Sequence, residues 1–210
     1  LNNRPFSSVE DLIFSEEIVY SKLNKKALNV LALSGALDCL KDDRFNGMKH
    51  FWSAIVVDRP KNRKKLDENI QAYQEEAEFS IDEKIANLSD LTGIFPLDLV
   101  INDVLHQRFR DRAIPPLGDE DNRFSYQVND GYISWCIPRE IIKKKTRNKK
   151  DFWIVRVTDE TCVDSKIKCW GVNSDKDSLY LNRPYIVKVN FSDQWGFSTK
   201  RGTSHWKLMG

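Results

Sequence analysis

The chain has 210 residues, of which 40% are hydrophobic and 30% charged, enough for one large or two modest domains with packed cores. Residues 1–120 carry 16 Lys or Arg and 21 Asp or Glu, a net charge of −5, whereas residues 121–210 carry 17 and 10, a net charge of +7. This asymmetry indicates that the C-terminal half meets a polyanion. No stretch approaches the roughly 18 apolar residues of a membrane span, so a spanning helix is excluded and we expect a cytoplasmic protein.

The cysteines and histidines are scattered along the chain. They form no C-x-x-C pair, so we expect no zinc site, and reduced thiols of this kind are typical of the cytosol. The chain begins at Leu1 without an initiator Met or a signal peptide, and we therefore expect a segment of a longer protein. The scattered cysteines and histidines are Cys39, Cys136, Cys162, Cys169, His50, His106 and His205.

The N-terminal half is predicted to be α-helical. Ser8 and Asn24 precede apolar residues with helical spacing, and Ser80 with Glu83 forms a capping box. Pro60 divides residues 45–74 into two helical pieces. Apolar residues at helical spacing also predict a helix from Pro96 with a buried side made of Leu97, Val100, Ile101, Val104 and Leu105.

A glycine-centred turn follows the helix that begins after Asn24. Two helices joined by Leu33-Ser34-Gly35-Ala36-Leu37 would form a helix-hairpin-helix, in which Gly approaches a phosphate and backbone N–H groups bind it. The alternative is an ordinary helix C-cap, for which Gly is also the usual residue. The candidate duplex DNA-binding residues are Lys25, Lys26, Ser34, Gly35 and Ala36.

Residues 114–121 are rich in Pro, Gly and acidic residues and coincide with the change in charge, which predicts a linker between a helical domain at 1–113 and a second domain at 122–210. After it, short strands are predicted near 131–142, 151–159, 165–171, 184–191 and 195–208. Five strands in about 85 residues favour a small barrel of the OB (oligonucleotide/oligosaccharide-binding) type. The predicted fold class is α+β, a helical half with a helix-hairpin-helix followed by a five-stranded OB-type barrel.

Cationic and aromatic side chains alternate in the predicted barrel. Alternation along a strand places Trp153 inward with Val155 and Val157, and places the neighbouring positions outward. Lys and Arg neutralise phosphates, and exposed rings stack on bases of any sequence, so we expect single-stranded DNA binding; the alternative is a solvated, charged outer face. The candidate single-strand-binding residues are Lys143, Lys144, Lys145, Arg147, Lys149 and Lys150 at a hairpin tip, and Phe152, Arg156, Lys166, Lys168 and Trp170 on the outer face.

Catalytic signals are weak in this sequence. Adjacent carboxylates such as Asp42-Asp43 and Asp82-Glu83 point to different sides of a helix and make poor metal pairs. There is no phosphate loop and no nucleophile elbow. We therefore expect no catalytic residue, no metal site and no cofactor in this chain.

Three segments carry motifs that occur together in one family. The first runs from Leu23-Asn24-Lys25-Lys26 to Ser34-Gly35-Ala36-Leu37-Asp38, the second is Glu83 to Leu97 with its motif at Leu91 to Leu97, and the third runs from Lys145-Thr146 to Asp159-Glu160-Thr161. In this order they resemble C-family replicative DNA polymerases, the family of the bacterial DNA polymerase III alpha subunit. The second segment lacks the family's His, and Asn148-Lys149 and Cys162 stand where the family has Gly.

The resemblance implies the C-terminal accessory region of a DNA replication enzyme, from a divergent and possibly phage-encoded member. The palm, with its catalytic carboxylates and Mg²⁺, would lie upstream. It implies that the hairpin grips duplex DNA and that the OB domain lies near the single-stranded template, with the remainder of the polymerase as a partner. The alternative function is a protein-interaction module that docks a sliding clamp or clamp loader. The segment Asn87-Leu88-Ser89-Asp90-Leu91 faintly resembles a clamp-binding peptide. The other interpretation of this segment is a helix whose apolar residues pack in the core.

Overall fold

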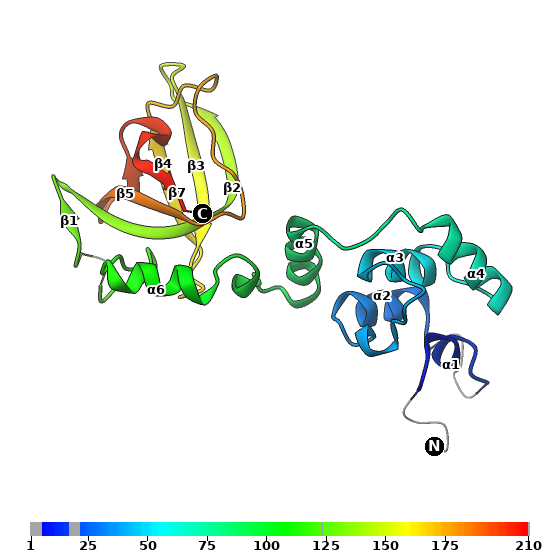
Figure 1. Ribbon diagram of the computed structural model, residues 1–210. Coiled ribbons are helices and arrows are strands. Elements are labelled where there is room, and N and C mark those ends of the chain that lie inside the picture. The colour runs from blue at the N-terminus through cyan, green and yellow to red at the C-terminus, as the bar shows by residue number, and fades with distance from the viewer. Residues whose placement is uncertain (1–5, 17–21, 123, 210) are drawn as a thin grey trace. The chain divides into compact units, whose positions relative to one another are not determined.

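The computed structural model describes residues 6–16, 22–122 and 124–209, and the chain divides into two compact units, Leu1–Phe95 and Pro96–Gly210. The first unit is helical and the second contains the strands (Figure 1). The predicted α+β fold class is confirmed. Within the described ranges, none of the helices has the length and apolar character needed to cross a membrane.

The first unit consists of short helices packed around one apolar core, with Leu28, Phe51 and Leu66 fully buried. Ser8, Asn24 and Ser80 cap their helices as predicted, and the Ser80–Glu83 capping box is present. The helix that follows Pro60 begins after the N-cap Asn62 and ends at the C-cap Tyr73. The elements are α1 (Val9–Ile13), α2 (Lys25–Leu33), the 3-10 turn η1 (Asp38–Leu40), α3 (Met48–Trp52), the π-helix η2 (Ser53–Val57), α4 (Arg63–Ala72) and α5 (Ile81–Thr92).

Two buried polar side chains, those of His50 and Asn69, connect α3, η2 and α4 in the first unit. The His50 ring accepts a hydrogen bond from the Asn46 N–H at 2.9 Å through Nδ1, and its Nε2 lies 2.8 Å from the Ile70 carbonyl oxygen. The Asn69 amide donates to the carbonyl oxygens of Ala54 and Asp58, where the π-helix ends. Because burial of a polar group is costly unless it is hydrogen-bonded, these bonds fix α4 against α3 and η2.

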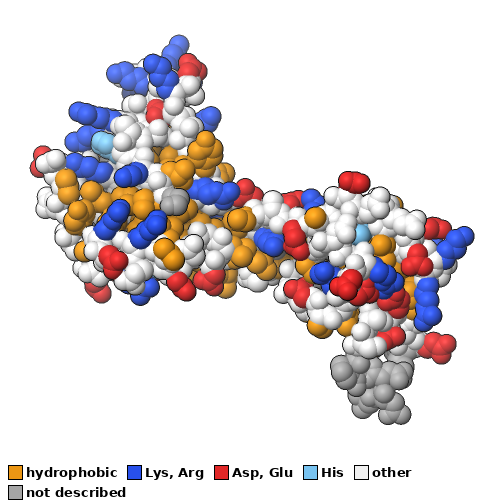
Figure 2. All heavy atoms as spheres, viewed as in Figure 1, with side chains coloured by type: hydrophobic (Ala, Val, Ile, Leu, Met, Phe, Trp, Pro, Cys, Tyr) orange, Lys and Arg blue, Asp and Glu red, His pale blue; other side chains and the backbone are white. Residues whose placement is uncertain are grey.

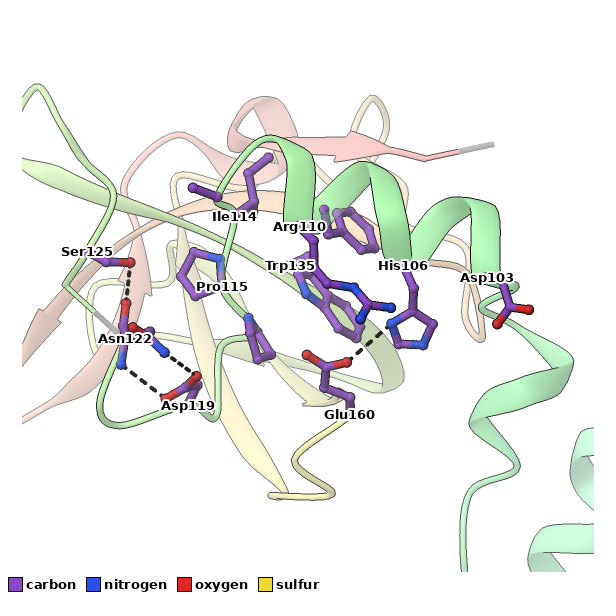
Figure 3. A pocket seen from close by; sticks show the side chains of 13 residues that line it. Asp103, His106, Arg110, Ile114, Pro115, Asp119, Asn122, Ser125, Trp135 and Glu160 are labelled. Carbon is purple, nitrogen blue, oxygen red and sulfur yellow. Dashed lines mark hydrogen bonds and ion pairs between the residues drawn. The ribbon is translucent and has the colours of Figure 1, made fainter.

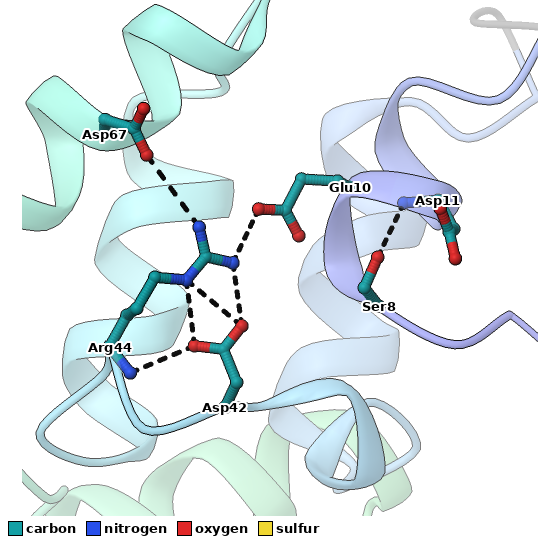
Figure 4. Close-up of polar contacts among 6 residues, drawn as sticks. All are labelled: Ser8, Glu10, Asp11, Asp42, Arg44 and Asp67. Carbon is teal, nitrogen blue, oxygen red and sulfur yellow. Dashed lines mark hydrogen bonds and ion pairs between the residues drawn. The ribbon is translucent and has the colours of Figure 1, made fainter.

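Arg44 joins three segments of the first unit on its surface (Figure 4). Its guanidinium contacts Glu10 of α1, Asp42 in its own turn and Asp67 of α4. Since these groups are partly exposed, the ion pairs contribute little to the free energy of folding. They connect α1 and α4 to the 42–45 turn.

The helix predicted from Pro96 begins later than expected. Leu97–Leu99 forms the 3-10 turn η3, and α6 (Asp103–Asp111) begins after Asn102, whose extended backbone and side-chain oxygen cap it through the Leu105 N–H. An Asn that accepts this bond competes with continuation of a helix. As a result Ile101 and Leu105 are buried, whereas Val104, predicted on the buried side, is 61% exposed.

The second unit contains a closed barrel of five strands, compatible with the OB type. β2 pairs antiparallel with β3, β3 with β4, β4 runs parallel to β6, β6 pairs antiparallel with β5, and β5 closes onto β2. Short edge strands β1 (Gln127–Val128) and β7 (Trp206–Leu208) pair with β2 and β5. The barrel strands are β2 (Gly131–Lys145), β3 (Asp151–Thr158), β4 (Ser165–Trp170), β5 (Tyr185–Ser192) and β6 (Gly196–Thr199).

The last predicted strand, 195–208, is interrupted. A 3-10 turn, η4 (Gly202–His205), separates β6 from β7 because Gly202 has φ +54° and the Asp177 carboxylate accepts hydrogen bonds from the Thr203 N–H and hydroxyl. A Cβ on Gly202 would lie 2.5 Å from the Asp177 side chain, so only Gly fits this close approach.

The predicted linker lies within the second unit and packs on the barrel. Residues 114–118 are buried, and Leu117 and Pro115 exchange backbone hydrogen bonds with Trp135 of β2 at 3.1 and 3.0 Å. Gly118 donates its N–H to the buried Asp159 carboxylate at 2.7 Å. On the same outer side of β2, the Phe109 ring of α6 stacks on Trp135 with centroids 4.8 Å apart.

Candidate nucleic-acid interface

The outer face of β2, β3 and β4 is built from cross-strand rows whose register is fixed by the buried side of the barrel. Trp153 is 2% exposed and lies in the core with Val155 and Val157, as the alternation predicts. Its neighbours therefore point outward. The pairings give three outer rows, namely Lys144–Phe152–Trp170, Ile142–Ile154–Lys168 and Glu140–Arg156–Lys166.

Aromatic groups occupy the row next to the hairpin tip. The rings of Phe152 and Trp170 stack with centroids 4.7 Å apart and an interplanar angle of 21°. Trp170 is 38% exposed, which leaves part of the indole open to solvent. Stacked ring pairs of this kind are favourable, so the contact with Phe152 supports the orientation in which the indole is partly exposed.

The tip itself is compact and strongly basic. The 146–150 turn is closed by the Thr146 N–H, which donates to the Lys150 carbonyl at 2.8 Å, and by Lys149 with φ +59°. Arg147, Lys149 and Lys150 are exposed on this turn. Figure 2 shows Lys and Arg side chains gathered at this end of the barrel.

Arg156 differs from the expected role. Its guanidinium is paired with Asp164 and, at 3.3 Å, with Glu140, and Asp164 followed by Glu140 raises the pKa of Arg156. The charge of Arg156 is thus balanced within the protein. The positive potential of the outer face is therefore concentrated at the tip and at Lys166 and Lys168.

Trp195, which the sequence reasoning did not select, adjoins this face. It lies in the β5–β6 turn and is 63% exposed. The Lys168 ammonium lies 5.0 Å from the centre of its ring and donates to its carbonyl oxygen at 3.1 Å. In an OB barrel this turn borders the binding face. The turn signal Gln194-Trp195-Gly196 could therefore have indicated that Trp195 lies beside that face.

Among the residues predicted to bind duplex DNA, Lys25 and Ser34 are engaged in hydrogen bonds within the first unit. Gly35 has φ +80°, which fits either a C-cap or a hairpin, but only the single 3-10 turn η1 follows it. Lys25 donates to the Val57 carbonyl at 3.0 Å, and the Ser34 hydroxyl donates to the Leu31 carbonyl at 3.2 Å. Lys26 and Ala36 are exposed.

A pocket of about 340 Å³, here called the tip pocket, lies beneath the basic tip. The Lys143 ammonium is 5.4 Å from the centre of the Trp153 ring, and the Lys145 ammonium is 3.9 Å from the Asp151 carboxylate. Its lining residues are Lys143, Lys144, Lys145, Asp151, Trp153 and Ser174.

A larger pocket of about 640 Å³ lies between α6, residues 113–122 with Ser125, and the 159–161 turn (Figure 3). His106 Nδ1 lies 3.2 Å from a Glu160 carboxylate oxygen, and the rings of His106 and Trp135 form a T-shaped pair with centroids 6.1 Å apart. Asn122, through its backbone and side-chain N–H groups, donates to the Asp119 carboxylate and lowers the pKa of Asp119. Besides His106, its charged lining residues are the carboxylates of Asp103, Asp119 and Glu160 and the guanidinium of Arg110.

Within the part of the chain that the structure describes, no group of three or more His, Cys, Asp or Glu side chains is arranged to hold a metal ion. Cys136 and Cys169 are buried inside the barrel, and burial raises the pKa of both thiols, that of Cys169 to about 11. These thiols are therefore protonated at neutral pH and unreactive.

Comparison with known proteins gives no family. No protein-family model matches the chain, and no curated protein matches it.

Proposed function

We propose that this protein binds single-stranded nucleic acid, without base-sequence specificity, on the outer face of β3 and β4. The observation that carries the proposal is the stacked Phe152–Trp170 pair beside Lys144 and the basic tip. Rings provide stacking surfaces that accept any base, and ammonium groups neutralise the backbone. Lys168 and Trp195 extend this surface to the β5–β6 turn.

The test is binding of fluorescently labelled oligonucleotides, followed by anisotropy over a range of salt concentrations. Trp170→Ala is expected to weaken binding by roughly 1–3 kcal/mol at every salt concentration, since stacking is insensitive to salt. Tyr180→Ala is the matched control, because Tyr180 is an exposed ring on the separate 171–184 segment. Equal affinities of the two variants would contradict the proposal.

The tip is tested by charge. Replacing Lys144, Arg147 and Lys149 by Glu is expected to weaken binding and to flatten the salt dependence by about 0.7 in slope for each phosphate that is no longer neutralised. Arg156→Gln is expected to have a smaller effect than the tip reversal, because the Arg156 guanidinium is already paired with Asp164 and Glu140. A loss caused by Arg156→Gln as large as that caused by the tip reversal would move the binding surface away from the tip.

We further propose that the protein works as an accessory region of a replicative polymerase, which the three family-like segments and the OB-type barrel support. The competing function is docking of a sliding clamp or clamp loader. It predicts complex formation with a clamp that persists at high salt and in Trp170→Ala. Salt-sensitive DNA binding without clamp binding favours the first function.

A further inference from the structure

The tip pocket lies on the opposite side of the β2–β3 hairpin from the stacked rings. In the register of these strands, Lys143 pairs with Trp153 and Lys145 with Asp151, whereas Lys144 pairs with Phe152. Trp153 points into the barrel and Phe152 points outward. Lys143 and Lys145 therefore lie on the pocket side of the hairpin, and Lys144 lies at the rim between the pocket and the outer face.

The groups lining the pocket are mostly donors with positive charge. Its lining includes three Lys side chains and one carboxylate, that of Asp151. This carboxylate already accepts from the Ser174 hydroxyl at 3.3 Å and lies 3.9 Å from Lys145. The lining therefore carries an excess of two positive charges, and its one carboxylate is already engaged, which suits an anionic ligand.

A second observation points to the same kind of ligand. Trp153 is 2% exposed, and its indole Nε1 is buried without a hydrogen-bond acceptor among the residues that the structure describes. A buried N–H without a partner is costly, and native proteins rarely keep one. An anion in the tip pocket would bring oxygen acceptors next to the ring that lacks one.

We propose that the tip pocket binds a phosphate monoester at the end of a nucleic-acid strand. A monoester carries a charge of about −1.5 to −2 at neutral pH, whereas each internal phosphate carries a single charge. A continuous strand on the outer face passes Lys144, but its end can turn over the tip toward Lys143 and Lys145. The proposal rests on the proposed function and adds a preference for strand ends.

The experiment uses the full chain and matched oligonucleotides with a 5′-phosphate, a 3′-phosphate or two hydroxyl ends. One phosphorylated end is expected to bind about tenfold more tightly than the hydroxyl-ended strand, the equivalent of one charge-assisted hydrogen bond. Lys143→Gln/Lys145→Gln should abolish this preference, so that the phosphorylated and hydroxyl-ended strands bind the variant with equal affinity. Lys207→Gln, an exposed Lys on β7, is the charge control and should leave the preference intact. Equal binding of all three oligonucleotides, or a preference that survives in the double variant, overturns the proposal.

A second measurement separates this proposal from the proposed function. Titration with inorganic phosphate or a nucleoside 5′-monophosphate, followed by ¹⁵N–¹H NMR, should shift the Trp153 indole resonance in the wild type but not in Lys143→Gln/Lys145→Gln. The shift should weaken below pH about 6, where a monoester takes up its second proton. A shift without any oligonucleotide binding supports the pocket and refutes strand binding. Oligonucleotide binding with an unshifted Trp153 resonance supports strand binding and overturns the pocket.

Discussion

Asp159 is a buried carboxylate that joins two segments 41 residues apart in the chain. It accepts from the Gly118 N–H and from both the N–H and the hydroxyl of Thr161. A Cβ on Gly118 would lie 2.3 Å from the Thr161 hydroxyl oxygen, so this position requires Gly. One side chain thus fastens residues 114–118 to the turn after β3.

Asp159→Ala is expected to lower the free energy of unfolding of the second unit by about 2–3 kcal/mol, because it leaves a buried N–H without an acceptor. Urea unfolding followed by tryptophan fluorescence measures it, since five of the six Trp lie beyond residue 121. Asp193→Ala, at an exposed position, is the control. Equal stabilities of the two variants would show that the Asp159 bonds contribute nothing net.

At the same scale, sequence reasoning located Trp153 and Trp170 because strict alternation with Val155 and Val157 fixes the side of each strand residue. It missed Trp195, since a turn residue has no periodic neighbours that reveal where its ring points. It also left the ion pairs of Arg156 unseen, because Asp164 and Glu140 meet it only through strand pairing.

At the scale of single elements, α5 depends on its first turn. The Glu83 carboxylate receives hydrogen bonds from Lys49 at 2.7 Å and from the Ser80 N–H at 2.8 Å. Lys49, followed by Ser80, lowers the pKa of Glu83 from 4.5 to about 2. A carboxylate with a lowered pKa stabilises the fold above its unfolded pKa, and this contribution is lost as the pH falls through about 2.

Glu83→Gln is therefore expected to lower the melting temperature of the first unit at pH 7, with a difference from the wild type that shrinks below pH 4.5 and disappears near pH 2. Circular dichroism at 222 nm at several pH values measures this difference. Asp90→Asn, near the other end of α5, should not reproduce it, because a negative charge there opposes the helix dipole. A difference that is independent of pH would contradict the predicted role of the charge.

Gly35 and Gly93 provide a test of the hairpin as an element. Both follow a helix with positive φ, +80° and +71°, so Val at either position strains the backbone by about 1–3 kcal/mol. If the hairpin holds a duplex phosphate, Gly35→Val weakens duplex binding in anisotropy measurements and Gly93→Val does not. Equal duplex affinities in the two folded variants would leave the 33–37 turn with a structural role only.

Some elements were predictable because their signals are local, such as the Ser80 capping box and the Asn24 cap. Others depend on distant residues. The helix expected at Pro96 yields to the cap at Asn102, and the strand expected at 195–208 is broken by contacts of Asp177 with Thr203. A carboxylate 26 residues away leaves no periodic signal in the strand it interrupts.

For the whole molecule, the position of the boundary between the two units determines which fragments fold. Residues 96–210 retain α6, the Phe109–Trp135 stack and the buried Leu117, whereas residues 122–210 lack all three. The longer fragment is expected to unfold cooperatively and to bind single strands like the full chain. The shorter one is expected to be less stable by more than about 3 kcal/mol, since removing a buried Leu alone costs about 2–5 kcal/mol. Urea unfolding of the two fragments compares them, and equal stabilities would place the boundary at 114–121.

The closure of the barrel also has a kinetic consequence. The C-terminal half of β2 pairs with its sequence neighbour β3, whereas its N-terminal half pairs with the distant β5, so that Tyr132 lies opposite Val189. Pairing of such distant segments requires a long loop to close and slows folding. During synthesis, half of β2 remains an unpaired edge until β5 has emerged, and during that interval it can pair with another chain. The same edge of β2 is unpaired whenever the barrel unfolds and refolds. The refolding yield should therefore fall as the protein concentration rises.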